Sequence, residues 1–389
     1  MEKKKTVNLD MKQYGMVLAL IAVFLIFSIL THGSNMTAMN INNLIMQNGY
    51  VVILAVGMLL CVLTGNIDLG VGSIVAVSSA VVGILMIDYK SNMWIAIIAA
   101  LVVGLLAGIF VGFFVAKLGI PPFIVTLATM LMGRGLTYTL LKAQTKGPLP
   151  TNYTYIGAGF LPTIKVPFGT GQLDLVCIVV AIVAAVLIVL SEIRSIKTKQ
   201  KYGFAINPMW QIALKLVVII GIEFFIFYKL AKYNGIPFQL LIMGVLVAIY
   251  HFITSKTVAG RQIYALGGNA KAAKLSGINT EKVFFWVYTN MGILSAVAGI
   301  VLCARNGSSI PKAGDGFEMD AIASCYIGGA ATAGGIGTII GAVVGAFIMG
   351  ILNNGMSLYG WSTDIQKIVK GAVLLGAVTV DLMSKRKKG

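Results

Sequence analysis

Long runs of apolar residues, separated by short polar connections, extend along almost the whole chain. A helix that crosses a membrane needs about 20 mostly apolar residues. Twelve segments approach or exceed this length, and they cover residues 15–31, 43–64, 70–88, 94–117, 123–143, 173–191, 211–230, 236–255, 281–303, 319–333, 337–352 and 366–383. Apolar residues follow one another in these runs instead of alternating with polar ones, so the pattern favours helices over a transmembrane β-barrel. We therefore predict an all-α, polytopic membrane protein with about 10–12 transmembrane helices.

Glycine interrupts the tenth and eleventh segments, which are short and nearly continuous, so ten or eleven spans stay open beside twelve. The run Gly334–Gly341 has two interpretations. Small residues let helices approach closely, which we favour, whereas the alternative is a broken helix that lines a translocation path. The stretch Gly70–Val75 resembles Gly335–Ile340, and each opens an apolar span. This pair is a weak indication of an internal repeat of unknown orientation.

The composition agrees with a membrane location. Of the residues, 58% are hydrophobic and 11% are charged, whereas soluble domains average about 45–50% and about 25%. The mean hydropathy is +0.91. These values exclude a water-soluble enzyme, a disordered chain and a secreted disulfide scaffold. The four cysteines lie in or beside apolar runs without the spacing of metal ligands, so we expect buried, inert thiols.

Basic residues outnumber acidic ones by 30 to 13, which gives a formal net charge of +17. Such an excess is typical of nucleic-acid binding or of the cytoplasmic loops of a membrane protein. Four basic clusters flank predicted spans, at residues 3–12, 194–201, 256–282 and 385–388. With twelve spans and a cytoplasmic N-terminus, all four clusters lie in the cytoplasm, and the outer loops at 32–42 and 353–365 carry no Lys or Arg. The distribution predicts cytoplasmic N- and C-termini and no nucleic-acid partner.

Sequence signatures of catalysis are missing. The chain contains no G-x-x-x-x-G-K-[ST] phosphate loop, no H-E-x-x-H motif and no G-x-S-x-G nucleophile elbow. We therefore expect that the chain is not an enzyme and holds no cofactor or metal. If the function of this protein requires ATP, we expect a separate chain to hydrolyse the ATP.

Charged residues within apolar segments are costly unless they are paired or hydrated, so each marks a candidate site. Asp68 and Asp320 each stand at the start of a predicted span. Either carboxylate could cap its helix, or could shape a mouth of a translocation path, with Asp68 on the cytoplasmic side and Asp320 on the outer side. We expect Arg134 to pair inside the protein, unless its span is broken at Gly133 or Gly135.

Lys215 and Glu223 lie eight residues apart on the seventh predicted span and so roughly on one face of a helix. We favour a structural contact over a role in proton relay. An enzyme embedded in the membrane would need clustered nucleophiles, bases or metal ligands, and the scattered acids and two histidines do not form such a cluster.

The connection at residues 257–279 is the most informative polar stretch. Asn269 is a candidate N-cap, Ala270–Leu275 are strong helix formers, and Gly277 is a suitable C-terminal stop. A short preformed helix between two spans offers a docking site for a soluble partner. The alternative is a plain connecting loop on the membrane surface.

Five stretches of the sequence resemble one protein family and follow one another in order from about residue 40 to the C-terminus. They are Asp68–Ser73, Pro122–Met130, the loop segments Ala265–Asn269, Ala272–Ala273 and Ser276–Ile278, the segments Asp320–Gly329 and Gly334–Gly337, and Ile368–Ala372. Together they resemble the permeases of bacterial sugar ABC importers of the ribose, galactose and xylose class. Three apolar runs lie between about 143 and 256 where shorter members have one. This longer form is most similar to xylose and multiple-monosaccharide permeases, and it implies extra helices within 144–255.

The resemblance implies a single permease domain (1–389) in a bacterial inner membrane, which translocates a monosaccharide. It implies a homodimer that works with two ATPase subunits or one fused double ATPase, which carry the ATP and Mg²⁺, and with an extracytoplasmic sugar-binding protein. The cytoplasmic coupling loop (256–280) would contact the ATPase through Gly267, Gly268, Asn269, Ala272, Ala273, Ser276 and Gly277. The translocation-path candidates are Asn66, Asp68, Thr126, Thr129, Asp320, Gly335, Gly337 and Thr338.

A proton-coupled secondary sugar transporter is the alternative function. It would work without an ATPase and would use acidic residues such as Glu223 or Asp68 as proton carriers. It would not need a docking helix.

Overall fold

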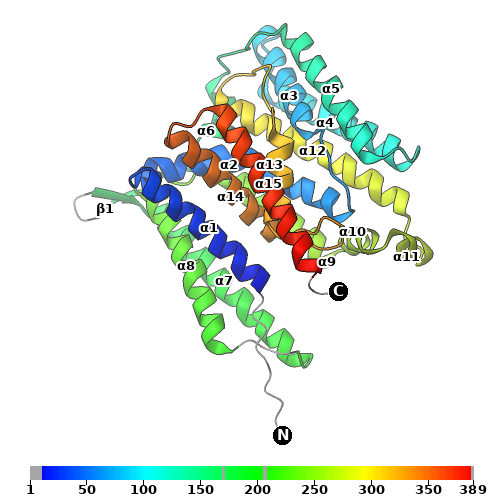
Figure 1. Ribbon diagram of the computed structural model, residues 1–389. Coiled ribbons are helices and arrows are strands. Elements are labelled where there is room, and N and C mark those ends of the chain that lie inside the picture. Colours follow the sequence, from blue (N-terminus) through cyan, green and yellow to red (C-terminus); the bar gives the residue numbers. More distant parts are fainter. Residues whose placement is uncertain (1–10, 169–170, 205–207, 387–389) are drawn as a thin grey trace. The chain divides into compact units, whose positions relative to one another are not determined.

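The computed structural model describes residues 11–168, 171–204 and 208–386. Helices make up most of this part of the chain (Figure 1). The elements are α1 (Met11–Leu30), η1 (Ser34–Met36), α2 (Ala38–Leu63), α3 (Val71–Gly83), η2 (Ile84–Asp88), α4 (Met93–Ala116), α5 (Pro122–Leu141), α6 (Thr151–Ala158), β1 (Lys165–Phe168), β2 (Gly171–Asp174), α7 (Leu175–Lys201), α8 (Met209–Ala231), α9 (Phe238–Lys256), α10 (Val258–Gly268), α11 (Ala270–Leu275), α12 (Thr280–Asn306), α13 (Phe317–Ile327), α14 (Ile339–Leu358) and α15 (Thr363–Arg386).

Nine helices in the described ranges are long and apolar enough to cross a membrane, namely α2, α3 continued by η2, α4, α5, α7, α8, α9, α12 and α14. They confirm nine of the twelve predicted segments and the prediction of a polytopic helical membrane protein. The eleventh segment, predicted to be short, is the 20-residue helix α14. The tenth, predicted over 319–333, is wrong as a spanning helix because α13 ends at Ile327 after 11 residues. At 1.5 Å per residue, α13 covers only about half of a hydrocarbon core of about 30 Å.

The chain divides into two compact units. Within the described residues, the first unit comprises Met11, Met36–Asn43 and Phe160–Pro237, and the second unit comprises Lys12–Asn35, Leu44–Gly159 and Phe238–Arg386. The long segment of the first unit falls inside the region 144–255 that the resemblance marks as an insertion. The single permease domain over 1–389 stays a prediction.

The first unit contains a feature that the all-α prediction missed. Strands β1 and β2 form an antiparallel hairpin in which Lys165 lies opposite Asp174. The Asp174 carboxylate then begins α7, because it accepts hydrogen bonds from Val176 N at 3.2 Å and Ile164 N at 2.9 Å. Helices α7 and α8 expose apolar side chains along most of their length, as helices that face lipid do.

Lys215 makes a structural contact within the first unit, as we favoured. Its ammonium lies 2.8 Å from the carboxylate of Glu192 on α7. Glu223 has no hydrogen-bond partner for either carboxylate oxygen among the described residues. The favoured structural contact is thus confirmed for Lys215, which ties α8 to α7.

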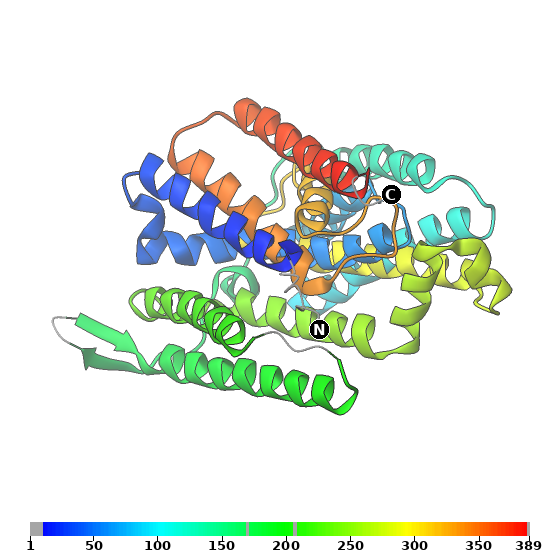
Figure 2. The same cartoon turned by 60° about the horizontal axis from the view of Figure 1, so that its bottom comes forward.

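In the second unit, α12 packs against α3 and α4 through small residues (Figures 1 and 2). A Cβ atom on Gly292 would overlap the Gly104 carbonyl oxygen, and one on Gly108 would lie 2.6 Å from the carbonyl oxygen of Thr289. Only glycine allows this approach of two backbones. Close packing at small residues is the usual way in which membrane helices associate.

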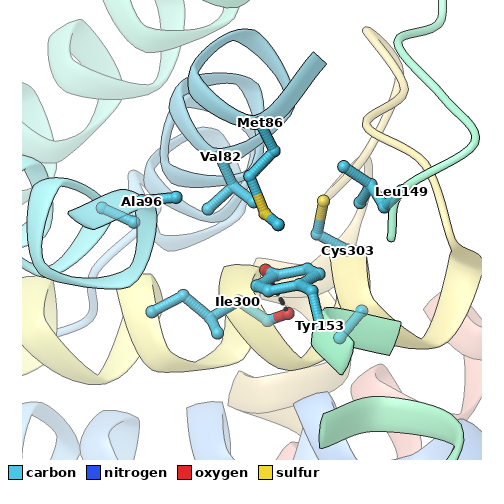
Figure 3. Close-up of a cluster of buried hydrophobic side chains, with 9 residues drawn as sticks. Val82, Met86, Ala96, Leu149, Tyr153, Ile300 and Cys303 are labelled. Atoms are coloured by element: carbon cyan, nitrogen blue, oxygen red, sulfur yellow. Dashed lines mark hydrogen bonds between the residues drawn. The ribbon is translucent and has the colours of Figure 1, made fainter. Parts of the chain in front are cut away.

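A cluster of buried side chains joins α3, α4, α6 and α12 (Figure 3). Tyr153 lies fully buried among Val82, Met86 and Cys303, and its hydroxyl donates to the Ile300 carbonyl at 3.0 Å. That bond satisfies the polar end of the ring, which burial would otherwise penalise. All four cysteines are buried and free, so the expectation of buried thiols is confirmed.

Candidate functional site

The segment predicted as the tenth span lies in the second unit, where an irregular segment precedes a half-length helix. Residues 307–316 run antiparallel alongside α3: the Ser309 hydroxyl lies 3.2 Å from that of Ser79, and a Cβ on Gly72 would overlap the Gly314 carbonyl oxygen. Helix α13 follows, and the turn at 328–338 leads into α14. Irregular backbone of this kind occurs at membrane depth only where protein or a water-filled path surrounds it.

Asp68 lies in the connection between α2 and α3, outside both spanning helices. Its side chain is 1% exposed, and its Oδ1 accepts a hydrogen bond from Gly70 N at 2.8 Å. Gly70 is the N-cap of α3, so the proposed N-cap role of Asp68 is wrong, and the carboxylate instead closes a turn that precedes the helix. Burial raises the pKa of Asp68 to about 7. A carboxyl group of this kind changes charge near neutral pH.

Thr129 lies close to Asp68, because a Cβ on Gly70 would lie 3.1 Å from Thr129 Cγ2 and 3.3 Å from Asp68 Oδ1. The hydroxyl of Thr129 donates to Val125 O at 2.9 Å, and that of Thr126 donates to Phe123 O at 3.3 Å. Both hydroxyls are therefore satisfied on their own helix.

In the described structure the Asn66 side-chain amide bonds only locally, donating to the Thr64 carbonyl at 3.1 Å and to the Thr64 hydroxyl at 3.4 Å. Thr338 is the N-cap of α14 and accepts from Gly341 N at 3.0 Å. The two stretches that resemble each other in sequence, at 70–75 and 335–340, thus both include a helix start.

Asp320 occupies a different place from Asp68 and joins three helices. It lies 1% exposed in the first turn of α13, whose N-cap is Gly316, so the capping interpretation is wrong here as well. Its carboxylate forms an ion pair with Lys370 of α15 at 2.9 Å and accepts from the Asn353 amide of α14 at 3.3 Å. Figures 1 and 2 show these helices side by side. Sequence analysis missed Lys370, although a lysine inside the last apolar segment was a usable signal.

Arg134 pairs inside the protein, as predicted. Its Nη1 donates to the Ala313 carbonyl at 2.6 Å and so holds the irregular segment 307–316 against α5. Helix α5 continues through Gly133 and Gly135, so the alternative of a broken span is wrong at this point.

The polar loop contains two helices where the sequence predicted one. The predicted helix is α11, with Asn269 as its N-cap accepting from Ala272 N at 3.0 Å and Gly277 after its end at φ +84°. Helix α10, which precedes it, was missed. Thr257 caps α10 through a bond from Gly260 N.

Three backbone segments of the second unit meet at the C-terminal end of α10, and we call this contact the glycine junction. The segments are the end of α2 (63–65), the end of α10 (264–268) and the turn at 333–337. The Gly335 N–H donates to the Leu63 carbonyl at 2.8 Å, and the Tyr264 hydroxyl donates to the Gly337 carbonyl at 2.7 Å. A Cβ on Gly267 would overlap the same Leu63 oxygen. The junction brings Gly335 and Gly337 beside Gly267, and Tyr264 is a member that sequence analysis missed.

The predicted coupling residues separate into exposed and packed groups. Gly268, Asn269, Ala272, Ser276 and Gly277 are exposed. Ala273 is 4% exposed, because it packs α11 inward, and Gly267 faces the junction, so neither lies on an accessible docking surface.

Leu275, the last residue of α11, is 90% exposed. An apolar side chain that ends a short polar helix is a signal that sequence analysis could have used.

The basic clusters at the two ends of the chain extend beyond the described residues. Lys3, Lys4, Lys5, Lys387 and Lys388 lie outside the described residues. Within the described side chains there is no group of three His, Cys, Asp or Glu that could hold a metal ion.

Sequence comparisons place the chain among transport permeases. The family model described as "Branched-chain amino acid transport system / permease component" matches residues 40–378. A xylose transport system permease protein from Haemophilus influenzae is 37% identical over all of both chains. A xylose transport system permease protein from Escherichia coli K12 is 36% identical, over 98% of this chain and 94% of its own. A ribose import permease protein from the same strain is 34% identical, over 89% and 86%. No solved structure matches.

Proposed function

This chain belongs to the family of branched-chain amino acid transport system / permease components, and from that premise we propose that it is the membrane-spanning subunit of an ABC importer for a monosaccharide. Relatives named as xylose and ribose permeases align over most or all of their length, which supports a pentose of the xylose type. Transport is the function of such a subunit, and it is not itself a catalytic enzyme. ATP hydrolysis then belongs to a partner chain.

The assembly that fits this function is a homodimer in the bacterial inner membrane with its N- and C-termini in the cytoplasm. Two ATPase subunits, or one fused double ATPase, would dock on the side of the loop 256–280, and a sugar-binding protein would deliver the substrate from the opposite side. The exposed basic residues Lys271 and Lys274 of α11 support a cytoplasmic position for this loop.

Leu275 is the side chain best suited to anchor the ATPase. It stands almost fully exposed at the end of α11, while the buried Ala273 holds that helix in place. A rigid apolar side chain that enters a partner's pocket typically contributes a large share of the binding free energy.

The glycine junction is the single observation that carries the coupling mechanism. Because α10 contacts both the end of α2 and the turn at 333–337, a displacement of the docked loop moves the two connections that contain Asp68 and the path candidate Gly337. Nucleotide binding can then shift the population between two arrangements of the helices around the path. Few hydroxyl-binding groups are needed along the path if the binding protein selects the sugar.

Substitution of Leu275 tests this assignment. We expect Leu275→Ser to weaken association of the ATPase about 30-fold, as loss of an interface anchor does, while the permease still inserts and keeps its melting temperature. The measurement is co-purification and the Kd for the ATPase in nanodiscs. Leu358→Ser is a matched control, because Leu358 also ends a helix and is exposed. Equal ATPase affinity of the two variants would disprove the anchor role.

Reconstitution distinguishes the proposed importer from a proton-coupled transporter. In proteoliposomes that contain the ATPase and the binding protein, we expect uptake of xylose to require ATP and to continue when the proton gradient is collapsed. Accumulation by the permease alone under a proton gradient would contradict the proposal.

A further inference from the structure

A cavity of about 550 Å³ lies in the second unit at the end where α9 finishes and α12 begins. Its walls come from α2, α9, α10 and α12, and none of the translocation-path candidates lines it. Its volume is within the range of about 300–1,000 Å³ found for small-molecule sites. The cavity is therefore a second place where this protein can hold a ligand.

The mouth of the cavity carries the residue types that anchor proteins at a membrane surface. Lys282 and Trp286 both line it and, four residues apart on α12, share one helix face. Trp286 is 57% exposed, and the Lys282 ammonium forms no ion pair among the described side chains. A lysine at the end of a span with a tryptophan one turn deeper is typical of contact with lipid headgroups.

The wall of the cavity is mostly apolar, and the polar side chains that line it beside Lys282 include Tyr250, Gln262, Asn279 and Asn290. Leu60, Ile263 and Val287 form much of the wall. Deeper along the same face of α12, the Asn290 carbonyl oxygen accepts a hydrogen bond from the Tyr250 hydroxyl. The Asn290 amide nitrogen is buried and has no hydrogen-bond partner among the described residues.

We propose that this cavity binds one acidic phospholipid. The phosphate lies at Lys282, and the upper part of an acyl chain follows the apolar wall formed by Leu60, Ile263 and Val287.

Lipid in this cavity also contacts the coupling apparatus. Gln262 and Ile263 of α10 line it, and the next residues of that helix, Tyr264 and Gly267, form the glycine junction. An occupant restrains α10 relative to α12. This consequence depends on the proposed function, whereas binding itself does not.

Quenching of Trp286 by brominated lipid tests the proposal without any transport assay. The substitutions Trp94→Phe, Trp210→Phe and Trp361→Phe leave Trp286 as the sole tryptophan. This protein is reconstituted in phosphatidylcholine vesicles with increasing fractions of brominated phosphatidylglycerol or brominated phosphatidylcholine. We expect half-maximal quenching at an about five-fold lower mole fraction of the acidic lipid, as one lysine near a membrane surface provides.

Matched charge variants test whether the preference for the acidic lipid arises at Lys282. Lys282→Glu is expected to abolish the five-fold preference and Lys282→Arg to keep it. Lys256→Glu makes the same charge change at the same end of the bundle, outside the cavity, and is expected to keep the preference. Equal loss in Lys256→Glu and Lys282→Glu would overturn the proposal in favour of general surface attraction.

Competition identifies the ligand. We expect that neither millimolar inorganic phosphate nor glycerol phosphate relieves the quenching, and that xylose has no effect. Relief by phosphate would show that a free anion occupies the site, and relief by xylose would show a sugar site. Either result overturns the assignment to lipid.

Discussion

Substitution of Gly267 by alanine is the most direct test of the glycine junction. A Cβ at this position would overlap the Leu63 carbonyl oxygen and lie 2.6 Å from Gly335 N, and both atoms belong to the backbone. Neither can move away as a flexible side chain would, so the three segments of the junction must separate. The neighbouring Gly268 is a matched control, because a Cβ there meets nothing within 4 Å.

The magnitude follows from three contributions. Alanine in place of glycine in a helix stabilises by up to about 1 kcal/mol, and this gain is common to both variants. Overpacking at Gly267 costs about 1–3 kcal/mol, and loss of the hydrogen bond between Gly335 N and Leu63 O costs about 1 kcal/mol. We therefore expect Gly267→Ala to lower the free energy of unfolding by about 1–3 kcal/mol and Gly268→Ala to leave it unchanged or slightly raised.

The assay is the ratio of sugar transported to ATP hydrolysed in proteoliposomes, together with the melting temperature. We expect Gly267→Ala to retain ATPase binding through α11 but to lower this ratio about ten-fold, within the usual range of coupling free energies. Gly268→Ala is expected to keep the ratio. If the two variants have the same ratio and the same melting temperature, the junction does not transmit the movement.

Two further predictions concern the buried carboxylates. Lys370→Met leaves Asp320 buried without its counter-ion, so we expect the free energy of unfolding, measured by thermal unfolding, to fall by about 3–5 kcal/mol. Lys367→Met breaks an exposed pair and is expected to cost less than about 1 kcal/mol. Equal losses in the two variants would refute the role of burial. Because burial raises the pKa of Asp68 to about 7, the native state binds this proton more tightly than the unfolded state does. The contribution of Asp68 to stability is therefore largest below the unfolded pKa of about 4 and falls as the pH rises toward 7. We expect Asp68→Asn to flatten this decline when the melting temperature is measured against pH. The same pH profile in the variant and the wild type would contradict this prediction.

The sequence alone determined most of the helices and the family. Long apolar runs predict spanning helices because lipid forces backbone groups to pair within a helix, and nine runs became such helices. The local signals around Asn269 and Gly277 correctly placed α11, because caps and stops act through neighbouring residues. The run of apolar residues did not reveal that α13 would end at Ile327, nor that an irregular segment packed against α3 would precede it.

Only the tertiary structure decided which residues act together. Gly267 and Ala273 carry the family resemblance in the same loop as Gly268, yet packing turns the first two inward and leaves Gly268 exposed. The partner of Asp320 is Lys370, fifty positions along the chain, and that of Gly337 is Tyr264. Local sequence specifies helices through interactions a few residues apart, whereas these contacts depend on how whole helices pack. For this reason the sequence indicated a permease with a coupling loop, whereas the fold showed that the end of α10 in this loop contacts the turn at 333–337.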